Sequence, residues 1–383
     1  MIMDTKIVKK LGMDIGFDIV KITNADSFLE DEKAALKRFN DGYINDYPWY
    51  DKDRIKLMNR PTLLLEGAKS VISLGASYLN PGTPDYDPNE LHGKIAKYAL
   101  GDDYHKVLKE RLKSFCTQIS ECLGQDVKTR IFVDDGPMND RAAARRSGLG
   151  WVGKNTNIIT ENYGSWVLLG QVITDLELDT DEPLKKNCGN CVRCIDDCPT
   201  GAIVAPYVID NSKCISYLTI ELKGIIPRDM RPLLGDWIFG CDICQDVCPV
   251  NRKAKFGTIR EFEKRKGFEL TELLPVLDMD QDTFSKVYKN SPIKRTKLSG
   301  LKRNVCVALG NIGDVRAVEP LSKILKKSDP VLKIHAAWAL GRIGGMSAYR
   351  ILLEELDKDN PIEVKDEIKY SLADLQAVNG KRN

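Results

Sequence analysis

Eight of the chain's eleven cysteines are concentrated between Cys188 and Cys248. Thiols clustered in this way in a reducing compartment are more often metal ligands than disulfides. The first group has the spacing C-x₂-C-x₂-C-x₃-C followed by proline, which is typical of bacterial ferredoxins. The second group repeats the last part of this motif, and Cys214 supplies its missing member from upstream. These cysteines predict two 4Fe–4S clusters that move electrons.

A ferredoxin-like crossing of the fourth cysteine assigns the ligands. Cluster one is predicted on Cys188, Cys191, Cys194 and Cys248. Cluster two is predicted on Cys198, Cys214, Cys241 and Cys244. Zinc is the alternative, because it also favours paired C-x₂-C units. A zinc site would not call for a third cysteine at the same spacing and a fourth one followed by proline, and still less for this pattern twice in one chain.

Three stretches of the first 180 residues also carry chemical groups. Tyr104 and His105 lie at the start of a predicted helix, and Asp134 follows a predicted strand. Residues 141–155 form a basic helix that runs into a glycine-rich loop, which would let the backbone approach a bulky ligand. This loop matches neither the Walker nor the Rossmann motif. Taken singly, Asp134 is equally explained as a turn or cap residue, and the arginines as a solvated face.

The elements that position these groups follow from periodicity. Apolar spacing predicts helices over 6–16 and 105–122. Runs rich in β-branched residues predict strands over 19–22, 70–74, 130–133 and 164–174. This alternation favours an α/β layer architecture for residues 1–180. Strand order cannot be obtained from the pattern.

The C-terminal part of the chain is repetitive. Residues 301–313 match residues 332–344, an offset of 31 residues, and each copy is a helix ended by a glycine-rich turn. Paired helices at this period are similar to a short HEAT-like solenoid, with a generic helical bundle as the alternative. The predicted domains are residues 1–180, a ferredoxin-like domain over 181–255, and a linker with helical repeats over 256–383.

Composition limits the possible partners. The formal net charge is only +2, so nucleic-acid binding would need a local basic patch. Residues 285–304 offer one, since they contain seven basic residues and no acidic one, including Lys294, Arg295 and Lys297. A solvated surface leading into the repeats is the alternative. No secretory leader follows Met1 and no run approaches the ~20 apolar residues of a membrane span, which predicts a cytoplasmic protein.

Together these features resemble one family, the epoxyqueuosine reductases, over essentially the whole chain. The resemblance rests on the Tyr104-His105 stretch, the Asp134 stretch, the glycine-rich loop, the doubled cluster motif with residues 214–221, and the terminal repeats. It implies a nitroreductase-like α+β domain that binds cobalamin. It also implies reduction of epoxyqueuosine to queuosine in the anticodon loop of tRNAs for Asp, Asn, His and Tyr, the last step of queuosine biosynthesis. A flavodoxin or ferredoxin as electron donor and a monomeric state are further implications.

The resemblance also implies site residues. In the mechanism we expect, the clusters reduce cobalamin to cob(I)alamin, and Asp134 gives a proton to the opening epoxide oxygen. That role requires a protonated carboxyl, which burial beside an apolar corrin face would favour. Tyr104, His105 and Arg141 are expected helpers. The cobalamin contacts implied are Lys97, Asp134, Gly153, Lys154, Asn155, Ile158 and Ser216. The Asp-x-His-x-x-Gly cobalamin motif is absent, because Leu108 stands where its glycine would be.

Two alternatives compete with this interpretation. The chain could be a corrinoid reductase of the reductive dehalogenase type that acts on a small molecule, although such a substrate does not need helical repeats. It could also be a non-catalytic electron-transfer protein that docks a redox enzyme through its repeats. The second alternative leaves Asp134 and the long glycine-rich loop unexplained.

Overall fold

The structure is a computed structural model that describes residues 4–44, 47–81, 90–265, 268 and 271–380. The chain forms two compact units that do not follow chain order. Unit 1 consists of residues 1–82, 101–212 and 242–263, and unit 2 of residues 83–100, 213–241 and 264–383. The domain boundaries expected at residues 180 and 255 stay predictions.

Unit 1 is built on a four-stranded sheet with the order β1-β2-β7-β4. The strands are β1 (Ile19–Asn24), β2 (Ser70–Ser77), β7 (Val167–Thr174) and β4 (Thr129–Phe132). Every pairing in this sheet is antiparallel, and all eight residues of β2 are buried. The unit is therefore α+β. The layered α/β reading of the strand–helix alternation is wrong, because antiparallel neighbours need no crossover helix between them.

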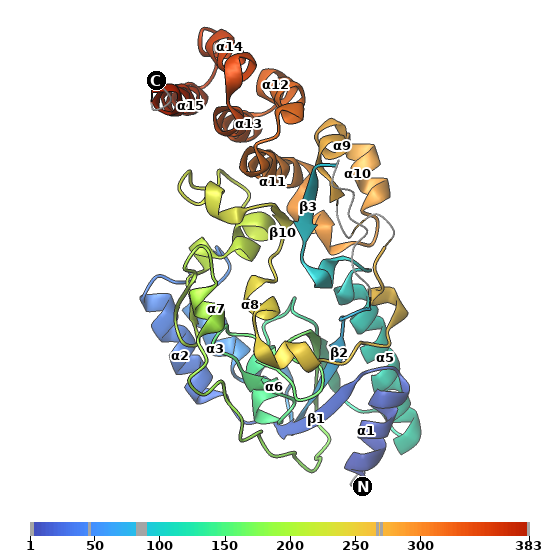
Figure 1. The fold of residues 1–383 in the computed structure, drawn as a ribbon. Coiled ribbons are helices and arrows are strands. Elements are labelled where there is room, and N and C mark those ends of the chain that lie inside the picture. The colour runs from blue at the N-terminus through green and yellow to red at the C-terminus, as the bar shows by residue number, and fades with distance from the viewer. Residues whose placement is uncertain (1–3, 45–46, 82–89, 266–267, 269–270, 381–383) are drawn as a thin grey trace. The chain divides into compact units, whose positions relative to one another are not determined.

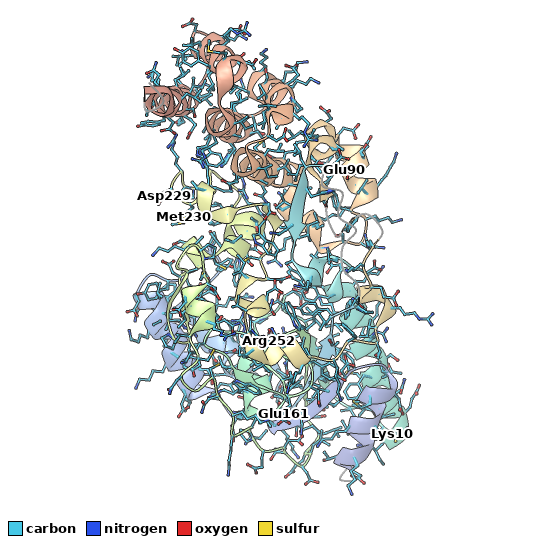
Figure 2. The ribbon with its side chains drawn as sticks, in the orientation of Figure 1. Lys10, Glu90, Glu161, Asp229, Met230 and Arg252 are labelled. Carbon is cyan, nitrogen blue, oxygen red and sulfur yellow. The ribbon has the colours of Figure 1, made fainter. Side chains whose placement is uncertain are left out.

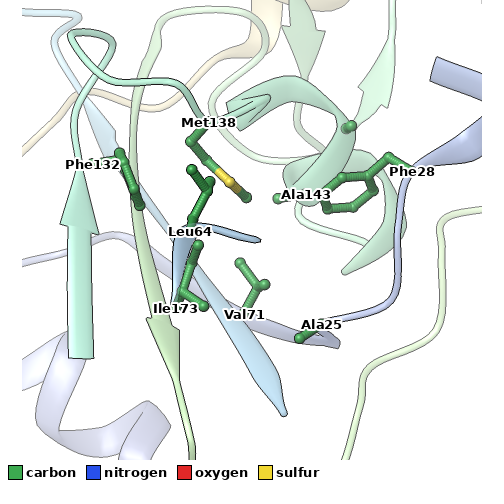
Figure 3. Packing of buried hydrophobic residues seen from close by; sticks show 9 residues of the cluster. Ala25, Phe28, Leu64, Val71, Phe132, Met138, Ala143 and Ile173 are labelled. Carbon is green, nitrogen blue, oxygen red and sulfur yellow. The ribbon is translucent and has the colours of Figure 1, made fainter. Parts of the chain in front are cut away.

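Helices pack on this sheet and enclose a hydrophobic core (Figure 1). Long α5 (Tyr104–Leu123) buries Val107, Leu108, Leu112, Phe115 and Ile119 at the three- and four-residue spacing of one helix face. The remaining helices are α1 (Thr5–Asp14), α2 (Leu29–Asn40), α3 (Lys52–Met58), α4 (Pro61–Leu64) and α6 (Asp140–Arg146). Figure 3 shows the core cluster in which α6 packs beside the sheet: Ala25, Phe28, Leu64, Val71, Phe132, Met138, Ala142, Ala143 and Ile173.

Short elements of unit 1 carry the glycine-rich loop and six of the clustered cysteines. Strands β5 (Trp151–Val152) and β6 (Ile158–Ile159) form a hairpin around the loop. Helices α7 (Arg193–Asp196) and α8 (Ile243–Asp246) contact each other, although 46 residues (197–242) lie between them in the sequence. Further short elements are β8 (Ile203–Ala205), β9 (Val208–Ile209), and 3₁₀-helices η2 (Asn211–Lys213), η5 (Pro249–Lys253) and η6 (Arg260–Phe262).

Unit 2 begins with a small sheet of order β10-β3-β11. Its strands are β10 (Trp237–Phe239), β3 (His92–Ile95) and β11 (Thr271–Glu272). A π-helix, η3 (Tyr217–Glu221), follows Cys214. The other connecting elements are the 3₁₀-helices η1 (Lys97–Ala99), η4 (Arg231–Leu234) and η7 (Pro292–Thr296), and the helices α9 (Leu273–Asp278) and α10 (Gln281–Val287).

Paired helices complete unit 2 where the sequence repeat predicts them (Figure 1). They are α11 (Lys297–Ile312), α12 (Val318–Lys327), α13 (Pro330–Ile343), α14 (Gly345–Leu356) and α15 (Ile362–Gly380), with the short η8 (Val315–Ala317) between the first two. Small residues let α11 and α13 approach closely, since a Cβ on Gly310 would lie 2.7 Å from the Trp338 ring. Among the described residues, none of the helices is long and apolar enough to span a membrane.

Candidate active site

Tyr104 and Asp134 meet in unit 1 through a short hydrogen bond. Asp134 lies just beyond β4, and its Oδ2 accepts a hydrogen bond from the Tyr104 hydroxyl at 2.6 Å. Its φ angle of 54° is left-handed, a conformation that costs free energy for a residue other than glycine and that recurs at functional sites. Tyr104 is buried, whereas Asp134 is exposed. Protein atoms of unit 1 therefore orient this carboxyl without burying it.

His105 supports Tyr104 from the same helix end. Asp103 caps α5, accepts the backbone N–H of His105 and lies 2.8 Å from His105 Nδ1. The His105 ring stacks on Tyr104, with centroids 4.1 Å apart. The structure thus brings together three of the four residues predicted to be catalytic, with Tyr104 between His105 and Asp134.

Arg141, the fourth, braces the glycine-rich loop. Its Nη1 donates to the carbonyl oxygen of Thr156 at 3.2 Å and lies 3.5 Å from the Thr156 hydroxyl oxygen. Thr156 itself has a left-handed φ of 67°. This contact gives Arg141 a part in the shape of the loop, and its expected part in proton supply stays a prediction.

Asp140 was not singled out from the sequence, yet its carboxyl lies near this site in an unusual environment. Its Oδ1 is buried and has no hydrogen-bond partner among the described residues. Burial, and then the charge of Asp134, raise the pKa of Asp140 well above its usual value. An acid in the first turn of a helix normally interacts favourably with the helix dipole, so its position in the sequence gives no sign of an unusual environment.

The glycine-rich loop contacts the cysteine segments of unit 1. Lys154 Nζ donates to the carbonyl oxygen of Gly189 at 2.8 Å, and Asn155 Nδ2 donates to that of Cys244 at 3.2 Å. Both side chains are buried. Gly153 closes the loop through a bond from its N–H to the Asn157 carbonyl. Ile158 is buried in a small cluster with Ala144 and Leu149.

The cobalamin contacts implied by the sequence are therefore divided. Asp134, Gly153, Lys154, Asn155 and Ile158 lie in unit 1, whereas Lys97 (in η1) and Ser216 (just before η3) lie in unit 2. Their role in binding cobalamin stays a prediction. Asp140 Oδ1 and Trp151 Nε1 are two of five buried side-chain atoms of unit 1 that have no hydrogen-bond partner in the described part of the chain, and the other three are arginine Nε atoms. Unsatisfied polar atoms of this kind are what a bound ligand or water would satisfy.

Four cysteines of unit 1 lie close enough to affect one another's pKa. Burial and the proximity of Cys188, Cys191 and Cys248 raise the pKa of the Cys194 thiol to about 11. The pKa of Cys248 is raised mainly by burial, and Cys188 and Cys191 add to the effect. These mutual effects place together the four cysteines predicted to hold cluster one. A cationic cluster would offset such repulsion between thiolates, so the donor set fits a 4Fe–4S cube.

The eight clustered cysteines form no disulfides. All eight are only partly buried. No three His, Cys, Asp or Glu side chains of the described residues converge on one point, as ligands of a single metal ion do. A 4Fe–4S cube distributes its four thiolates over four irons, so its cysteine ligands lie further apart than the ligands of a single metal ion.

Arg252, labelled in Figure 2, is an exposed cation in the short helix after Cys248.

The cysteines predicted for cluster two are distributed over both units. Cys198 and Cys244 belong to unit 1, and Cys214 and Cys241 belong to unit 2. Their assignment to one cluster stays a prediction.

The predicted nucleic-acid patch is only partly available. Lys294, Arg295 and Lys297 are exposed, and Arg295 forms an ion pair with Glu221 at 2.7 Å. Arg303, counted in the basic stretch, is completely buried and donates to backbone carbonyl groups instead. The run of like charge in the sequence could not reveal this, because helix α11 turns Arg303 inward.

Comparison with family models defines the class of protein first. Residues 187–251 match a 4Fe-4S double cluster binding domain, and residues 299–373 match HEAT repeats. Both confirm the expectations from the cysteine spacing and the helical repeat. The chain is thus a double-cluster iron–sulfur protein with C-terminal HEAT repeats. Residues 59–135, which include Tyr104 and Asp134, match a model described as Epoxyqueuosine reductase QueG, DUF1730.

Curated relatives and solved structures agree on the family. The epoxyqueuosine reductase of Escherichia coli K12 is 38% identical, and the match covers 88% of each chain. That of Leadbetterella byssophila is 43% identical over 79% of this chain and 97% of the relative. A selenomethionine-labelled epoxyqueuosine reductase superimposes with a TM-score of 0.91 at 31% identity, covering 97% of this chain and 98% of that one. This chain belongs to the epoxyqueuosine reductase family, as its resemblance implied.

Two further solved structures bear on the site. One is an epoxyqueuosine reductase with a tRNA-Tyr epoxyqueuosine-modified stem loop, at 31% identity and a TM-score of 0.90 over 97% of this chain and 98% of that one. The other is the Bacillus subtilis enzyme with its Asp134 catalytic loop swung out of the active site. It is 30% identical, with a TM-score of 0.90 over the same shares.

Proposed function

We propose that this chain reduces epoxyqueuosine to queuosine at the wobble position of tRNA. The observation that carries the proposal is the Tyr104–Asp134 hydrogen bond. In a member of this family, it holds the carboxyl of a residue with left-handed backbone just beyond β4. Support comes from the relatives named epoxyqueuosine reductase and from the related structure that holds an epoxyqueuosine-modified stem loop.

The reaction determines what the chain must supply. Removal of an epoxide oxygen as water consumes two electrons and two protons and leaves a carbon–carbon double bond. The double-cluster domain supplies a route for electrons that arrive singly from a donor such as a flavodoxin or ferredoxin. In our assignment, one cluster is held by Cys188, Cys191, Cys194 and Cys248, and the other by Cys198, Cys214, Cys241 and Cys244.

Cobalamin is the cofactor that this proposal requires, and when bound it supplies a strongly nucleophilic reduced metal centre for the epoxide. The unsatisfied Asp140 Oδ1 and Trp151 Nε1 fit a ligand-binding surface on unit 1. Lys154 and Asn155 hold the peptide backbone next to cysteines in both groups, so they keep the cluster segments close to this surface. We assign them this role besides any contact with the cofactor.

Proton delivery falls to Asp134. Its exposed carboxyl can reach a bound substrate, and the Tyr104 hydroxyl fixes the direction of one carboxyl oxygen. Tyr104 is in turn held by the stacked His105 ring. A positioned acid of this kind typically contributes 10²–10⁴-fold to a rate, roughly.

The tRNA would be bound through phosphate contacts and an everted base. A base modified within an anticodon loop is unstacked and enters the pocket singly, rather than being read inside a duplex. We assign Lys294, Arg295 and Lys297 to the phosphate backbone, with Arg295 also paired to Glu221. The HEAT repeats suit a macromolecular substrate, and we propose that the chain acts as a monomer in the cytoplasm.

Asp134→Asn tests the proposal. Asparagine tolerates left-handed backbone and can still accept the Tyr104 hydrogen bond, so the variant removes the proton and little else. We expect conversion of epoxyqueuosine in tRNA, followed by mass after digestion, to slow by about 10²-fold or more. Asp135→Asn is the matched control, because Asp135 is exposed, adjacent, and paired with Lys109. Equal rates for Asp134→Asn and wild type, with clusters and corrinoid intact, would remove Asp134 from the mechanism.

A further inference from the structure

The two cysteines of unit 2, Cys214 and Cys241, are each adjacent in sequence to a residue that is hydrogen-bonded to Thr219. Cys214 precedes a helical turn that continues as the π-helix η3, and its carbonyl accepts the N–H of Leu218 at 2.9 Å. π-Helical turns are rare and are frequent at functional sites. Cys241 follows β10 and Gly240, whose φ of +68° turns the chain out of the strand.

Thr219 joins these two segments. Its side chain is completely buried. The Thr219 hydroxyl donates to the carbonyl oxygen of Ile215 at 2.7 Å and accepts the N–H of Gly240 at 2.9 Å. One hydroxyl therefore links the residue after Cys214 to the residue before Cys241.

Asn304 of the first repeat helix, α11, holds the same two segments from the other side. Its amide nitrogen donates to the carbonyl oxygens of Thr219 at 2.7 Å and Ile238 at 2.8 Å. Its amide oxygen accepts from Arg303 at 2.9 and 3.1 Å. Asn304 is buried, and every donor and acceptor of its side chain is used. Loss of such a group removes the Asn304 hydrogen bond from the Ile238 carbonyl and leaves the Thr219 carbonyl with the Thr296 hydroxyl, which donates to it at 3.1 Å.

Arg303 extends the arrangement to the end of η3. Its guanidinium donates to the carbonyl oxygens of Leu218, Leu222 and Gly224 at 2.7–2.8 Å. These are carbonyl groups at a helix end, which lack partners within the helix. The buried pair Arg303–Asn304 thus stabilises the whole segment that carries Cys214.

We propose that Thr219 and Asn304 are positioning residues that align Cys214 and Cys241 as ligands of the same 4Fe–4S cluster. Helix α11 is consequently part of the framework of the metal centre as well as the first helix of the repeats. The inference rests on the ligand assignment in the proposed function, and it adds residues that neither bind iron nor touch substrate.

Asn304→Ala tests the inference, with Asn311→Ala as its matched control. Asn311 lies two turns further along α11 and also donates twice to backbone carbonyls, those of Arg231 and Gly235. Both variants remove two hydrogen bonds that one helix donates to backbone carbonyls, but only Asn304 touches the cysteine segments. Asn304→Ala also removes the acceptor of two hydrogen bonds from Arg303. After anaerobic reconstitution, Asn304→Ala is expected to hold about half the iron and sulfide of wild type, whose two clusters contain about eight irons. Asn311→Ala is expected to keep the full amount.

Thr219→Val provides a second variant that leaves α11 unchanged. Valine keeps the shape of threonine and removes the hydroxyl link, so it too is expected to lose iron from one cluster, seen by electron paramagnetic resonance of the reduced protein. Circular dichroism reports whether each variant folds. If Asn304→Ala does not fold, the iron content of Thr219→Val decides whether the inference holds. Full iron in folded Asn304→Ala and Thr219→Val would overturn the inference. Fewer than two clusters in wild type would instead reject the ligand assignment of the proposed function.

Discussion

At the scale of residues, two carboxyl groups near the site differ in their surroundings: that of Asp134 is oriented by a hydrogen bond, and that of Asp140 has a shifted pKa. Tyr104 donates to the Asp134 carboxyl, and Asp140 stands nearby with a raised pKa. Asp134 is exposed, whereas Asp140 is half-buried and its Oδ1 atom is completely buried. The geometry therefore leaves the Asp134 carboxyl accessible, as its proposed role as proton donor requires, and the raised pKa of Asp140 favours the neutral form of that carboxyl.

Tyr104→Phe should lower the rate without unfolding the chain. Phenylalanine keeps the buried ring and the stacking on His105, but it removes the hydroxyl that orients Asp134. A typical side-chain hydrogen bond contributes about 0.5–1.5 kcal/mol, so we expect a rate loss of about two- to tenfold. Single-turnover conversion of modified tRNA measures it, with thermal unfolding as the control for stability. An unchanged rate would show that Asp134 needs no such orientation.

Asp140→Asn should change how stability depends on pH. The pKa of Asp140 is raised in the folded chain, so the unfolded chain ionises first as the pH increases. The wild type therefore loses stability from about pH 4 upward, until the pH exceeds the raised pKa, and the asparagine variant lacks this loss. We expect the difference in melting temperature, variant minus wild type, to grow with pH over this range. A difference that stays constant would mean that Asp140 ionises normally.

Residue spacing predicted the double-cluster domain more directly than it predicted the acid site. The cysteine motif is local, and the double-cluster match confirms its purpose. Tyr104 and Asp134 are 30 residues apart, so only the family resemblance could pair them before the structure did. Asp140 was missed because the sequence of a helix's first turn does not show whether an acidic side chain there is buried. Lys154 and Asn155 were predicted for their loop, but their contacts with Gly189 and Cys244 depend on tertiary packing.

At the scale of elements, most segments of the fold were predictable and their pairing was not. The strands expected at 19–22 and 70–74 are β1 and β2, and the helices expected at 6–16 and 105–122 are α1 and α5. Hydrophobic period reports a segment's own conformation, but strand order depends on contacts distant in sequence. That is why the antiparallel order β1-β2-β7-β4 emerged only from the structure.

His335 links helix α13 to the segment around Ile226 through a hydrogen bond that depends on pH. Its Nε2 accepts the N–H of Ile226 at 3.1 Å, and its Nδ1 lies 2.6 Å from the Val331 carbonyl oxygen. Complete burial lowers the pKa of His335 well below its usual value, and the charges of Arg231 and Arg303 act in the same direction. The neutral ring is therefore the form that fits.

The repeats should lose stability in acid through His335. A histidine with a lowered folded pKa contributes fully above its unfolded pKa of about 6.5 and loses that contribution as the pH falls below it. The loss should approach about 1.4 kcal/mol per pH unit. In His335→Gln, which keeps a hydrogen-bonding side chain but cannot titrate, chemical unfolding should show a weaker dependence between about pH 7 and 5. Equal slopes for both proteins would contradict the assignment.

At the scale of the whole molecule, the sequence predicted three consecutive parts, whereas the structure has two interleaved units. Residues 83–100 and 213–241 join the repeats in unit 2, and residues 242–263 return to unit 1. Composition changes along a chain mark consecutive segments, so they could not predict this exchange. The exchange explains why the cysteine region, continuous as a motif, is divided between units.

Charge on the exposed basic patch should control tRNA affinity. Lys294→Glu with Lys297→Glu removes two exposed cations, and each lost phosphate contact lowers the slope of log affinity against log salt by about 0.7–0.9. We expect weaker binding and a slope reduced by about 1.4–1.8 in a filter-binding titration. The matched control is Lys326→Glu with Lys327→Glu, two exposed lysines at the end of α12. Identical titrations for both double variants would show that the patch makes no specific contact.

The most direct test of the account is conversion of the substrate by the wild-type chain. Protein reconstituted with iron, sulfide and cobalamin would be mixed anaerobically with reductant and tRNA from cells blocked at the last step. The tRNA would then be digested and its nucleosides weighed by mass spectrometry. The account predicts that epoxyqueuosine becomes queuosine only when cobalamin is present. No conversion by protein verified to contain both clusters and the corrinoid would contradict it and favour a reductase of small molecules.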